Sequence, residues 1–155
     1  MSRVYLVQHG EAKPTDEDPE RPLTSEGERA VRRMAAFAAK VQLHVDEIRH
    51  SGKRRAQQTA AIFAERLKLR GGVVAVEGLA PNDDVKPLAR TLSDQTGPIM
   101  LVGHLPFLAR LAGRLVAGNA EREVVRFRMG GIVCLERSEE GRWAVAWAVT
   151  PELLP

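Results

Sequence analysis

Two histidines each stand beside a glycine at the end of an apolar run. His9 lies in the segment QHG that follows RVYLV (3–7), and His104 ends the segment PIMLVGH (98–104). A neutral imidazole is a good nucleophile near pH 7, and a neighbouring glycine lets a ligand approach the backbone closely. Either histidine alone is more often a structural residue. Because both histidines follow an apolar run and lie beside a glycine, however, we predict one crevice that holds both imidazoles.

A third polar segment, HSGKRRAQQT (50–59), carries Lys53, Arg54 and Arg55 where a helix is predicted to begin. Cations oppose the partial positive charge at a helix N-terminus, so their presence needs an explanation. One explanation is an anion bound by the helix end and the cations together. The other is a solvated basic face, and the segment by itself leaves both open.

Apolar runs and helical patterns alternate along the chain and would position these segments. The helix that begins near Ser25 carries the capping-box pattern with Glu28. Near the C-terminus, further strands are expected at 123–127, 131–137 and 142–149. Earlier strands are expected at 3–7, 45–51, 73–77 and 98–104, and helices at 25–41, at 54–69 (stopped by Gly71 and Gly72), at 84–95 and at 106–118.

This alternation predicts the α/β class, with a single domain over 1–155. A mostly parallel central sheet would lie between helices on both faces, in three layers, with a more antiparallel C-terminal part. The unbroken apolarity of 98–104 predicts a central strand. Ligand sites of such sheets lie outside the carboxyl ends of the strands. All three polar segments are therefore expected to meet at one edge of the sheet.

The composition is typical of a soluble globular protein. Hydrophobic residues make up 44% and charged residues 28% of 155 residues, with a net charge of only +3. That charge is weak support for a nucleic-acid partner. No run approaches the roughly 18 apolar residues that span a bilayer, and the single Cys134 indicates a reduced thiol in the core. We expect a cytoplasmic protein that binds no membrane.

The order and spacing of these segments resemble the histidine phosphatase superfamily. Its phosphoglycerate mutase-like members carry R-H-G after the first strand, an arginine before the second helix and a later histidine. RPLTSEGERA (21–30), HSGKRRAQQT (50–59), LAPNDDV (79–85) and LVGHLPFL (101–108) are similar to small bacterial phosphohistidine phosphatases of the SixA type. The resemblance covers nearly the whole chain. It implies a phosphoglycerate mutase-like fold and an activity that needs no cofactor and no metal.

The resemblance also implies roles for individual residues. His9 would take the phosphoryl group as the nucleophile, and Arg55 and His104 would bind and neutralise its oxygens. Phosphoryl transfer needs in-line positioning and positive charge around three equatorial oxygens, which Arg55 and a protonated His104 would supply. Ser51 and backbone amides near Gly10 are possible additional donors.

Position 8 departs from the R-H-G pattern, because Gln8 stands in place of the arginine. Glutamine keeps a donor group for the phosphate but lacks the charge and the bidentate fork. A charged hydrogen bond contributes roughly 1.5–3 kcal/mol, so its loss corresponds to roughly 10- to 150-fold in affinity or rate. Arg54 is a better candidate for compensation than Arg3, which lies far from the strand's carboxyl end, although compensation is not the favoured outcome. A module that binds a phosphorylated ligand without turnover is therefore the serious alternative.

The substrate class depends on the leaving group. Phosphoesters leave as poor alkoxides and usually need a positioned acid; Glu77 is nearest in sequence, while Asp83 and Asp84 are more often helix caps. A phosphorylated imidazole is more labile and fits a site without a strong acid. The short connection after Glu77 also indicates an open site. The resemblance favours phosphohistidine on a partner protein, such as a phosphotransfer domain, with small phosphoesters as the alternative.

Other classes of site find little support. The four histidines lack a close ligand spacing such as H-x-x-x-H, which argues against a metal site. The pair Gly52-Lys53 lacks the remaining residues of a P-loop, and KRRAQQ has no interleaved aromatic residues for nucleic acid. Trp143 and Trp147 lie in a predicted strand, where we favour a place in the core over a contact surface.

Overall fold

The computed structural model describes residues 2–155, which fold around one six-stranded sheet. The strand order is β3-β2-β4-β1-β5-β6. The first four strands of that order are parallel, whereas β5 runs antiparallel to β1 and to β6. This confirms the expected mostly parallel sheet with an antiparallel C-terminal part. The strands are β1 (Ser2–Gln8), β2 (Glu47–His50), β3 (Gly72–Ala75), β4 (Ile99–Gly103), β5 (Ile132–Arg137) and β6 (Trp143–Val149).

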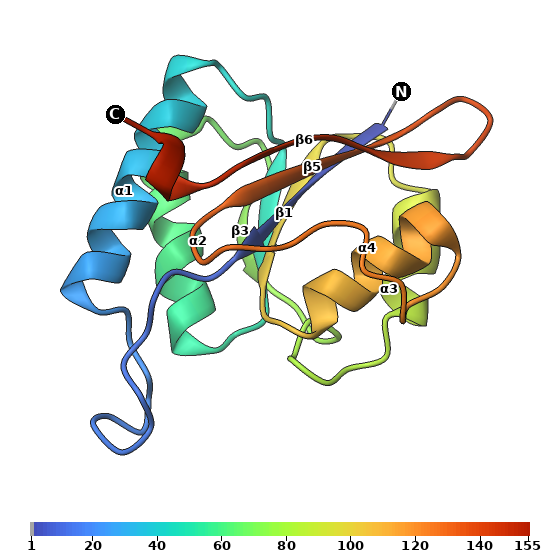
Figure 1. The fold of residues 1–155 in the computed structure, drawn as a ribbon. Coiled ribbons are helices and arrows are strands. Elements are labelled where there is room, and N and C mark those ends of the chain that lie inside the picture. The colour runs from blue at the N-terminus through green and yellow to red at the C-terminus, as the bar shows by residue number, and fades with distance from the viewer. Residues whose placement is uncertain (1) are drawn as a thin grey trace.

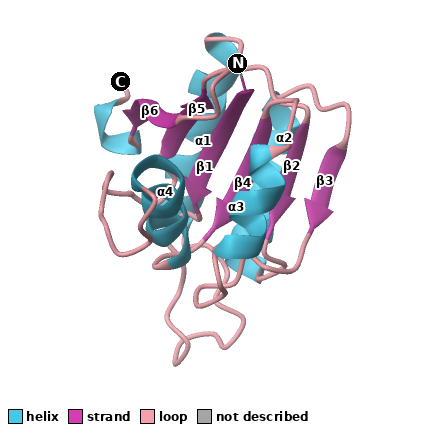
Figure 2. Ribbon diagram, turned by 90° about the vertical axis from the view of Figure 1, so that its right-hand side faces the viewer, coloured by secondary structure: helices cyan, strands magenta, loops and turns pink. Residues whose placement is uncertain are grey.

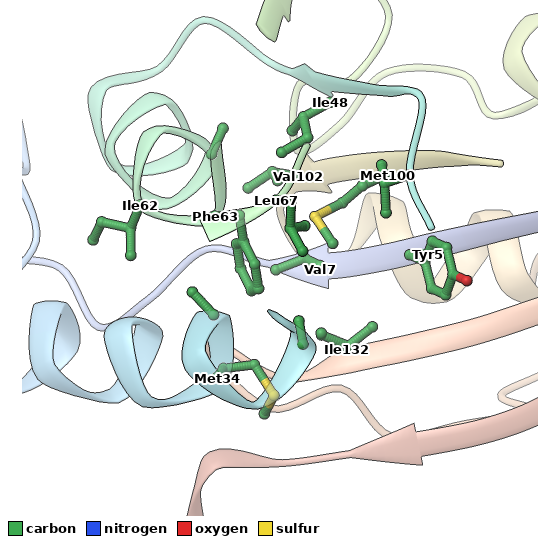
Figure 3. Close-up of a cluster of buried hydrophobic side chains, with 14 of the residues drawn as sticks. Tyr5, Val7, Met34, Ile48, Ile62, Phe63, Leu67, Met100, Val102 and Ile132 are labelled. Atoms are coloured by element: carbon green, nitrogen blue, oxygen red, sulfur yellow. The ribbon is translucent and has the colours of Figure 1, made fainter. Parts of the chain in front are cut away.

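Helices cover both faces of the sheet (Figures 1 and 2). Alternate residues of β1 face opposite sides: Tyr5 and Val7 pack with α1 and α2, and Val4 and Leu6 pack with α3 and α4. Figure 3 shows the first of these two cores, where Phe63 of α2 lies close to Val7. The helices are α1 (Ser25–Lys40), α2 (Arg54–Arg66), α3 (Lys86–Ser93) and α4 (Phe107–Ala117), with a 3-10 helix at Pro151–Leu153.

The central place of β4 follows from its sequence. All five residues of IMLVG are buried, because the strand has β2 on one side, β1 on the other and helices above and below. Gly118 ends the following helix in a left-handed conformation (φ 70°), as its position in the sequence predicts.

Three local expectations are wrong. The cap of α1 is Thr24, whose Oγ1 accepts a hydrogen bond from Gly27 N (2.9 Å), one residue before the expected Ser25. Helix α2 ends at Arg66, before the two glycines, because the chain turns at Leu67 to bury that side chain. Residues 123–127 form no strand: this segment crosses the α3/α4 side with Phe127 buried there, and only Met129 beyond it forms an isolated bridge to Gln8 of β1.

The remaining expectations for the core are confirmed. Trp143 is buried with the α3/α4 core, and Trp147 packs against the other core beside Tyr5, with ring centroids 5.9 Å apart. Cys134 is buried, and burial raises the pKa of its thiol to about 11. Within residues 2–155, no helix is both long enough and apolar enough to cross a membrane.

The register of the sheet brings the ends of three strands together. Gln8 at the end of β1 pairs with Gly103 at the end of β4, and His50 at the end of β2 pairs with Val102 of β4. The residues that immediately follow these strands therefore leave the sheet at one edge.

Candidate active site

Two imidazoles lie side by side at the carboxyl edge of the sheet. The rings of His9 and His104 have centroids 5.0 Å apart and are tilted by 51°. Both side chains are buried, with exposed fractions of 8% and 1%. His9 is held where β1 ends, since its amide donates to the carbonyl of Gly103 at 3.0 Å. The structure therefore brings together the two histidines that the sequence separates by 95 positions.

The backbone fixes the tautomer of His9. Its Nδ1 lies 2.7 Å from the carbonyl oxygen of Gly10. A carbonyl oxygen only accepts hydrogen bonds, so Nδ1 must carry the proton and donate it. The neutral ring then has its free lone pair on Nε2, which is the atom that acts as a nucleophile.

The surroundings of His9 keep its ring neutral. Burial lowers the pKa of His9 to about 4, although the hydrogen bond to Gly10 opposes that change. The positive charges of Arg55 and Arg21 lower the pKa further, because they repel an imidazolium. At neutral pH the lone pair on Nε2 is therefore available.

His104 is bound to Ser51, the residue that follows β2. Its Nε2 lies 2.6 Å from Ser51 Oγ. Burial, followed by the charges of His9, Arg55 and other nearby cations, lowers the pKa of His104 to about 3. In the protein by itself His104 is therefore neutral, because one more positive charge is unfavourable in a buried site that already holds a guanidinium. The protonated His104 expected beside a phosphoryl group stays a prediction.

Arg55 enters the site from the first turn of α2. The pKa of its guanidinium is lowered by burial and by the positive charge of Arg21. Its Nε is buried without a hydrogen-bond partner, and so is Nδ1 of His104. Only three such side-chain atoms occur in residues 2–155, and two belong to this site. Buried polar groups normally have partners, so the pair indicates a place where a ligand supplies the missing partners.

Arg21 belongs to the site, and sequence reasoning missed this role. Its charge lowers the pKa of His9, of Arg55 and of His104. It sits in the loop before α1 with a positive φ of 49°, and its Nε donates to the carbonyl of Lys13 at 3.0 Å. No periodicity marks a loop residue. The only signal was its place as the first residue of RPLTSEGERA, the segment that carries part of the resemblance.

The structure turns two other arginines, Arg54 and Arg3, toward acids and away from the site. Arg54 is exposed, with Nη1 3.9 Å from a carboxylate oxygen of Glu20, and its charge does not act on either imidazole. Arg3 forms an ion pair with Glu136 at the opposite end of β1, so its exclusion from the site is confirmed. Besides Arg55, the positive charge of Arg21 acts on both histidines and that of Lys53 acts on His104, whereas Arg54 acts on neither.

The amide of Gly10 differs from expectation, whereas the contact of Gln8 with a phosphate stays a prediction. Gln8 is half-buried and continues the β1 face of Val4 and Leu6, toward α3 and α4. The amide of Gly10 donates to Thr59 Oγ1 at 3.0 Å, so it is not free to bind a phosphate. A Cβ at Gly10 would lie 2.7 Å from Val31 Cγ2, which shows that glycine is needed for packing against α1.

Thr59 is a second residue that sequence reasoning missed. It is fully buried on α2 and links two functional segments through one oxygen. Its Oγ1 accepts the hydrogen bond from Gly10 N (3.0 Å) and donates to the carbonyl of Arg55 (2.8 Å). The threonine thereby fixes the loop of the nucleophile against the helix of the arginine. Its sequence position shows only a helix interior facing the core.

A cleft of about 520 Å³ adjoins Ser51 and is lined by the three candidate acids. Asp83 accepts a hydrogen bond from the amide of Ala80 (2.8 Å), and Asp84 accepts one from the amide of Lys86 (3.0 Å). Both aspartates therefore stabilise the loop before α3. The expected helix cap is wrong, because the N-cap of α3 is Val85, which makes no side-chain hydrogen bond. Glu77 is exposed and accepts no such bond. Within residues 2–155, no three acidic, histidine or cysteine side chains cluster to hold a metal ion.

Comparisons with known proteins agree with this geometry. A family model described as "Histidine phosphatase superfamily (branch 1)" matches residues 4–80. The chain is 25% identical to "Phosphohistidine phosphatase SixA" of Escherichia coli (strain K12), over 96% of the chain and 94% of that protein. It is 30% identical to an uncharacterized protein of Picosynechococcus sp. (strain ATCC 27264 / PCC 7002 / PR-6), over 85% and 83%.

Solved structures show the same fold. The structure of "the protein histidine phosphatase SixA complexed with tungstate" superimposes with a TM-score of 0.86 at 24% identity, and the match covers 97% of this chain and 98% of that one. The phosphoglycerate mutase-like architecture expected from the sequence is therefore confirmed.

Proposed function

The chain belongs to the histidine phosphatase superfamily, and from that premise we propose that it hydrolyses a phosphoryl group through a phosphohistidine intermediate on His9. The observation that carries the proposal is the pairing of a free lone pair with buried polar atoms that have no partner. Nε2 of His9 is unprotonated at neutral pH, and it lies beside Arg55 and His104, each with a buried polar atom that has no partner.

The reaction divides into two displacements. In the first, Nε2 of His9 attacks phosphorus in line with the leaving group; the N–P bond forms, and the leaving group departs with the electron pair of its bond to phosphorus and takes up a proton. In the second, water attacks the phosphohistidine, inorganic phosphate is released and the neutral imidazole is restored. The first displacement is easier than direct hydrolysis because an imidazole is a better nucleophile than water, and the second is easier because the N–P bond that breaks is labile.

Positive charge around the transferred group stabilises both transition states. Arg55 and Arg21 provide two guanidinium groups beside His9, and His104 adds a ring nitrogen. A bound dianion reverses the electrostatic balance at His104, because its negative charge offsets the repulsion from the two arginines. Protonation of His104 then follows phosphate binding instead of preceding it.

The cleft beside Ser51 supports protein N-phosphohistidine as the substrate. It is open to solvent and has room for a side chain that belongs to another protein. Its lining carboxylates, Glu77, Asp83 and Asp84, favour a neutral or cationic leaving group such as imidazole and disfavour metabolites with additional negative charge. Glu77 remains the candidate acid for a leaving group that needs one. A phosphotransfer domain is the kind of partner that we propose, and a small phosphoester is the alternative.

Gln8 supports the second candidate function, a domain that binds a phosphorylated ligand with little turnover. The half-buried amide adds no charge to the site. An arginine at this position would add a charged hydrogen bond worth roughly 1.5–3 kcal/mol, or roughly 10- to 150-fold in rate if it acts only in the transition state. We therefore expect Gln8→Arg to increase kcat.

Steady-state hydrolysis separates the two functions. We would compare wild-type protein, His9→Ala and Gln8→Arg on histidine-phosphorylated protein and on an aryl phosphate, with His44→Ala as the control. His44 is exposed and lies before β2, at the opposite end of the sheet. We expect His9→Ala, and none of the other proteins, to lose both turnover and the acid-labile phosphoenzyme. Wild-type turnover equal to that of His9→Ala on every substrate would exclude the enzyme.

A further inference from the structure

A basic groove is lined by residues of α3 and α4, the two helices that lie in front of the sheet in Figure 2. It has a volume of about 320 Å³. Three exposed cations line it, Lys86 and Arg90 from α3 and Arg114 from α4, and no carboxylate is among its lining residues. Ala89, Leu115 and Trp143 give it apolar walls. The groove therefore combines positive charge with a small hydrophobic surface.

Interactions within the protein do not explain all three cations. Lys86 and Arg90 are four residues apart on one helix face, where like charges repel. Arg90 and Arg114 lie in last turns, where the helix dipole favours them, but Lys86 opposes the dipole at the first residue of α3. None of the ten ion pairs among residues 2–155 involves any of the three.

The cleft and the groove are lined by adjacent residues at the start of α3. Pro87 lines the cleft, and the adjacent Lys86 lines the groove. From Lys86 the groove follows α3 to Ser93, which is about 10 Å at 1.5 Å per helical residue. Three or four residues of extended peptide span about that distance. A short segment next to a phosphohistidine in the cleft can therefore lie along the groove.

We propose that the α3–α4 groove binds an acidic segment, with at least one apolar side chain, of the phosphorylated protein whose phosphohistidine enters the cleft. This inference rests on the proposed function and adds the recognition of its partner. The cations attract the carboxylates, while Trp143 and Leu115 contact the apolar side chain. Aromatic and arginine side chains together are characteristic of binding surfaces.

Synthetic substrates test this recognition. The probes are N-phosphoimidazole and histidine peptides phosphorylated with phosphoramidate, in which a Gly-Gly spacer joins the phosphohistidine to a Glu-Leu-Glu-Glu tail. The tail precedes the histidine in one peptide and follows it in another, and matched peptides carry Gln in place of Glu. We would measure kcat and KM for wild-type protein, Arg90→Glu and Arg90→Glu/Arg114→Glu. Arg33→Glu, at an exposed arginine of α1, makes the same charge change far from the groove.

We expect the wild-type protein to show a lower KM for one acidic peptide than for its Gln counterpart. The double variant should raise that KM by about 5- to 30-fold at low ionic strength, and salt should reduce the difference. Arg33→Glu should change KM less than about 2-fold, and hydrolysis of N-phosphoimidazole should be the same in all four proteins. No preference in the wild type, a preference retained in the double variant, or an equal loss in Arg33→Glu would each overturn the inference.

Peptide binding separates this inference from the proposed function. If no protein hydrolyses N-phosphoimidazole above the His9→Ala level, the phosphatase is excluded. Fluorescence anisotropy of a labelled Glu-Leu-Glu-Glu peptide still tests whether the groove binds an acidic segment, because binding requires no turnover. We expect weaker binding by Arg90→Glu/Arg114→Glu than by Arg33→Glu. Equal binding by those variants would contradict the inference. So would tighter binding of a labelled oligothymidylate than of the acidic peptide by the wild-type protein.

Discussion

Replacement of Thr59 by valine tests whether the nucleophile is positioned through α2. Valine has nearly the shape of threonine, so the fully buried site stays filled while the hydroxyl is lost. The change removes the acceptor of the 3.0 Å hydrogen bond from Gly10 N and leaves that amide buried without a partner. The bond from Thr59 Oγ1 to the carbonyl of Arg55 is lost as well.

The magnitude follows from the cost of the unsatisfied amide. A buried donor without a partner costs about 1–3 kcal/mol, so we expect the free energy of unfolding of Thr59→Val to fall by about that amount. If the loop moves to satisfy the amide elsewhere, His9 moves with it. A displacement of that kind lowers kcat by roughly 10- to 100-fold. KM should change less, because the guanidinium of Arg55 remains on its helix.

Urea denaturation and steady-state kinetics, at a temperature where every variant is folded, measure the two effects. Thr91→Val is the matched control: Thr91 makes the same side-chain bond to the carbonyl four residues earlier, at 3.2 Å, but it is exposed and contacts no loop of the site. We expect its stability to change by less than about 0.5 kcal/mol. Thr59→Ser should restore most of kcat. A folded Thr59→Val protein with wild-type kcat would refute the positioning role.

Three further predictions concern His9 and the loop that follows it. Since the pKa of His9 is lowered to about 4, kcat/KM at subsaturating substrate should not fall between pH 8 and 5 and should fall as the pH approaches 4; a drop centred near pH 6.5 would contradict this. The pKa of His9 is higher in the unfolded chain than in the folded protein, so the unfolded chain binds more protons in acid. As the pH is lowered from about 6.5 to 4, the free energy of unfolding should therefore fall by about 1.4 kcal/mol per pH unit because of this group. Denaturation curves of His9→Asn should lack that contribution, and parallel losses in both proteins would exclude it. Gly27→Ala should destabilise the protein by about 1–3 kcal/mol or more, because its Cβ would lie against the carbonyl oxygen of Glu11; an unchanged denaturation midpoint would show that the loop yields freely.

Local patterns were sufficient for most of the fold. The apolar runs around Val4 and Leu101 fixed two neighbouring strands, because extended segments buried on both faces must be apolar throughout. The helix of Val31 and Met34 followed from its spacing of buried residues. Residues 123–127 were wrongly assigned to a strand, because a β-rich run becomes a strand only where a neighbouring edge is free, and that condition depends on the whole sheet.

The sequence by itself placed His9, Ser51 and His104 directly after three strands, and the parallel pairing of β1, β2 and β4 then required them to share one edge. Only the tertiary structure decided which cations join them. Arg21 approaches from a loop and Arg54 turns toward Glu20, although Arg54 is the closer in sequence to Arg55. The protonation of the two imidazoles was also undetermined, because a pKa depends on burial and on charges from distant parts of the chain. Residue order determines backbone pairing through local periodicity, whereas the direction of a long charged side chain is determined by packing between segments that no local pattern connects.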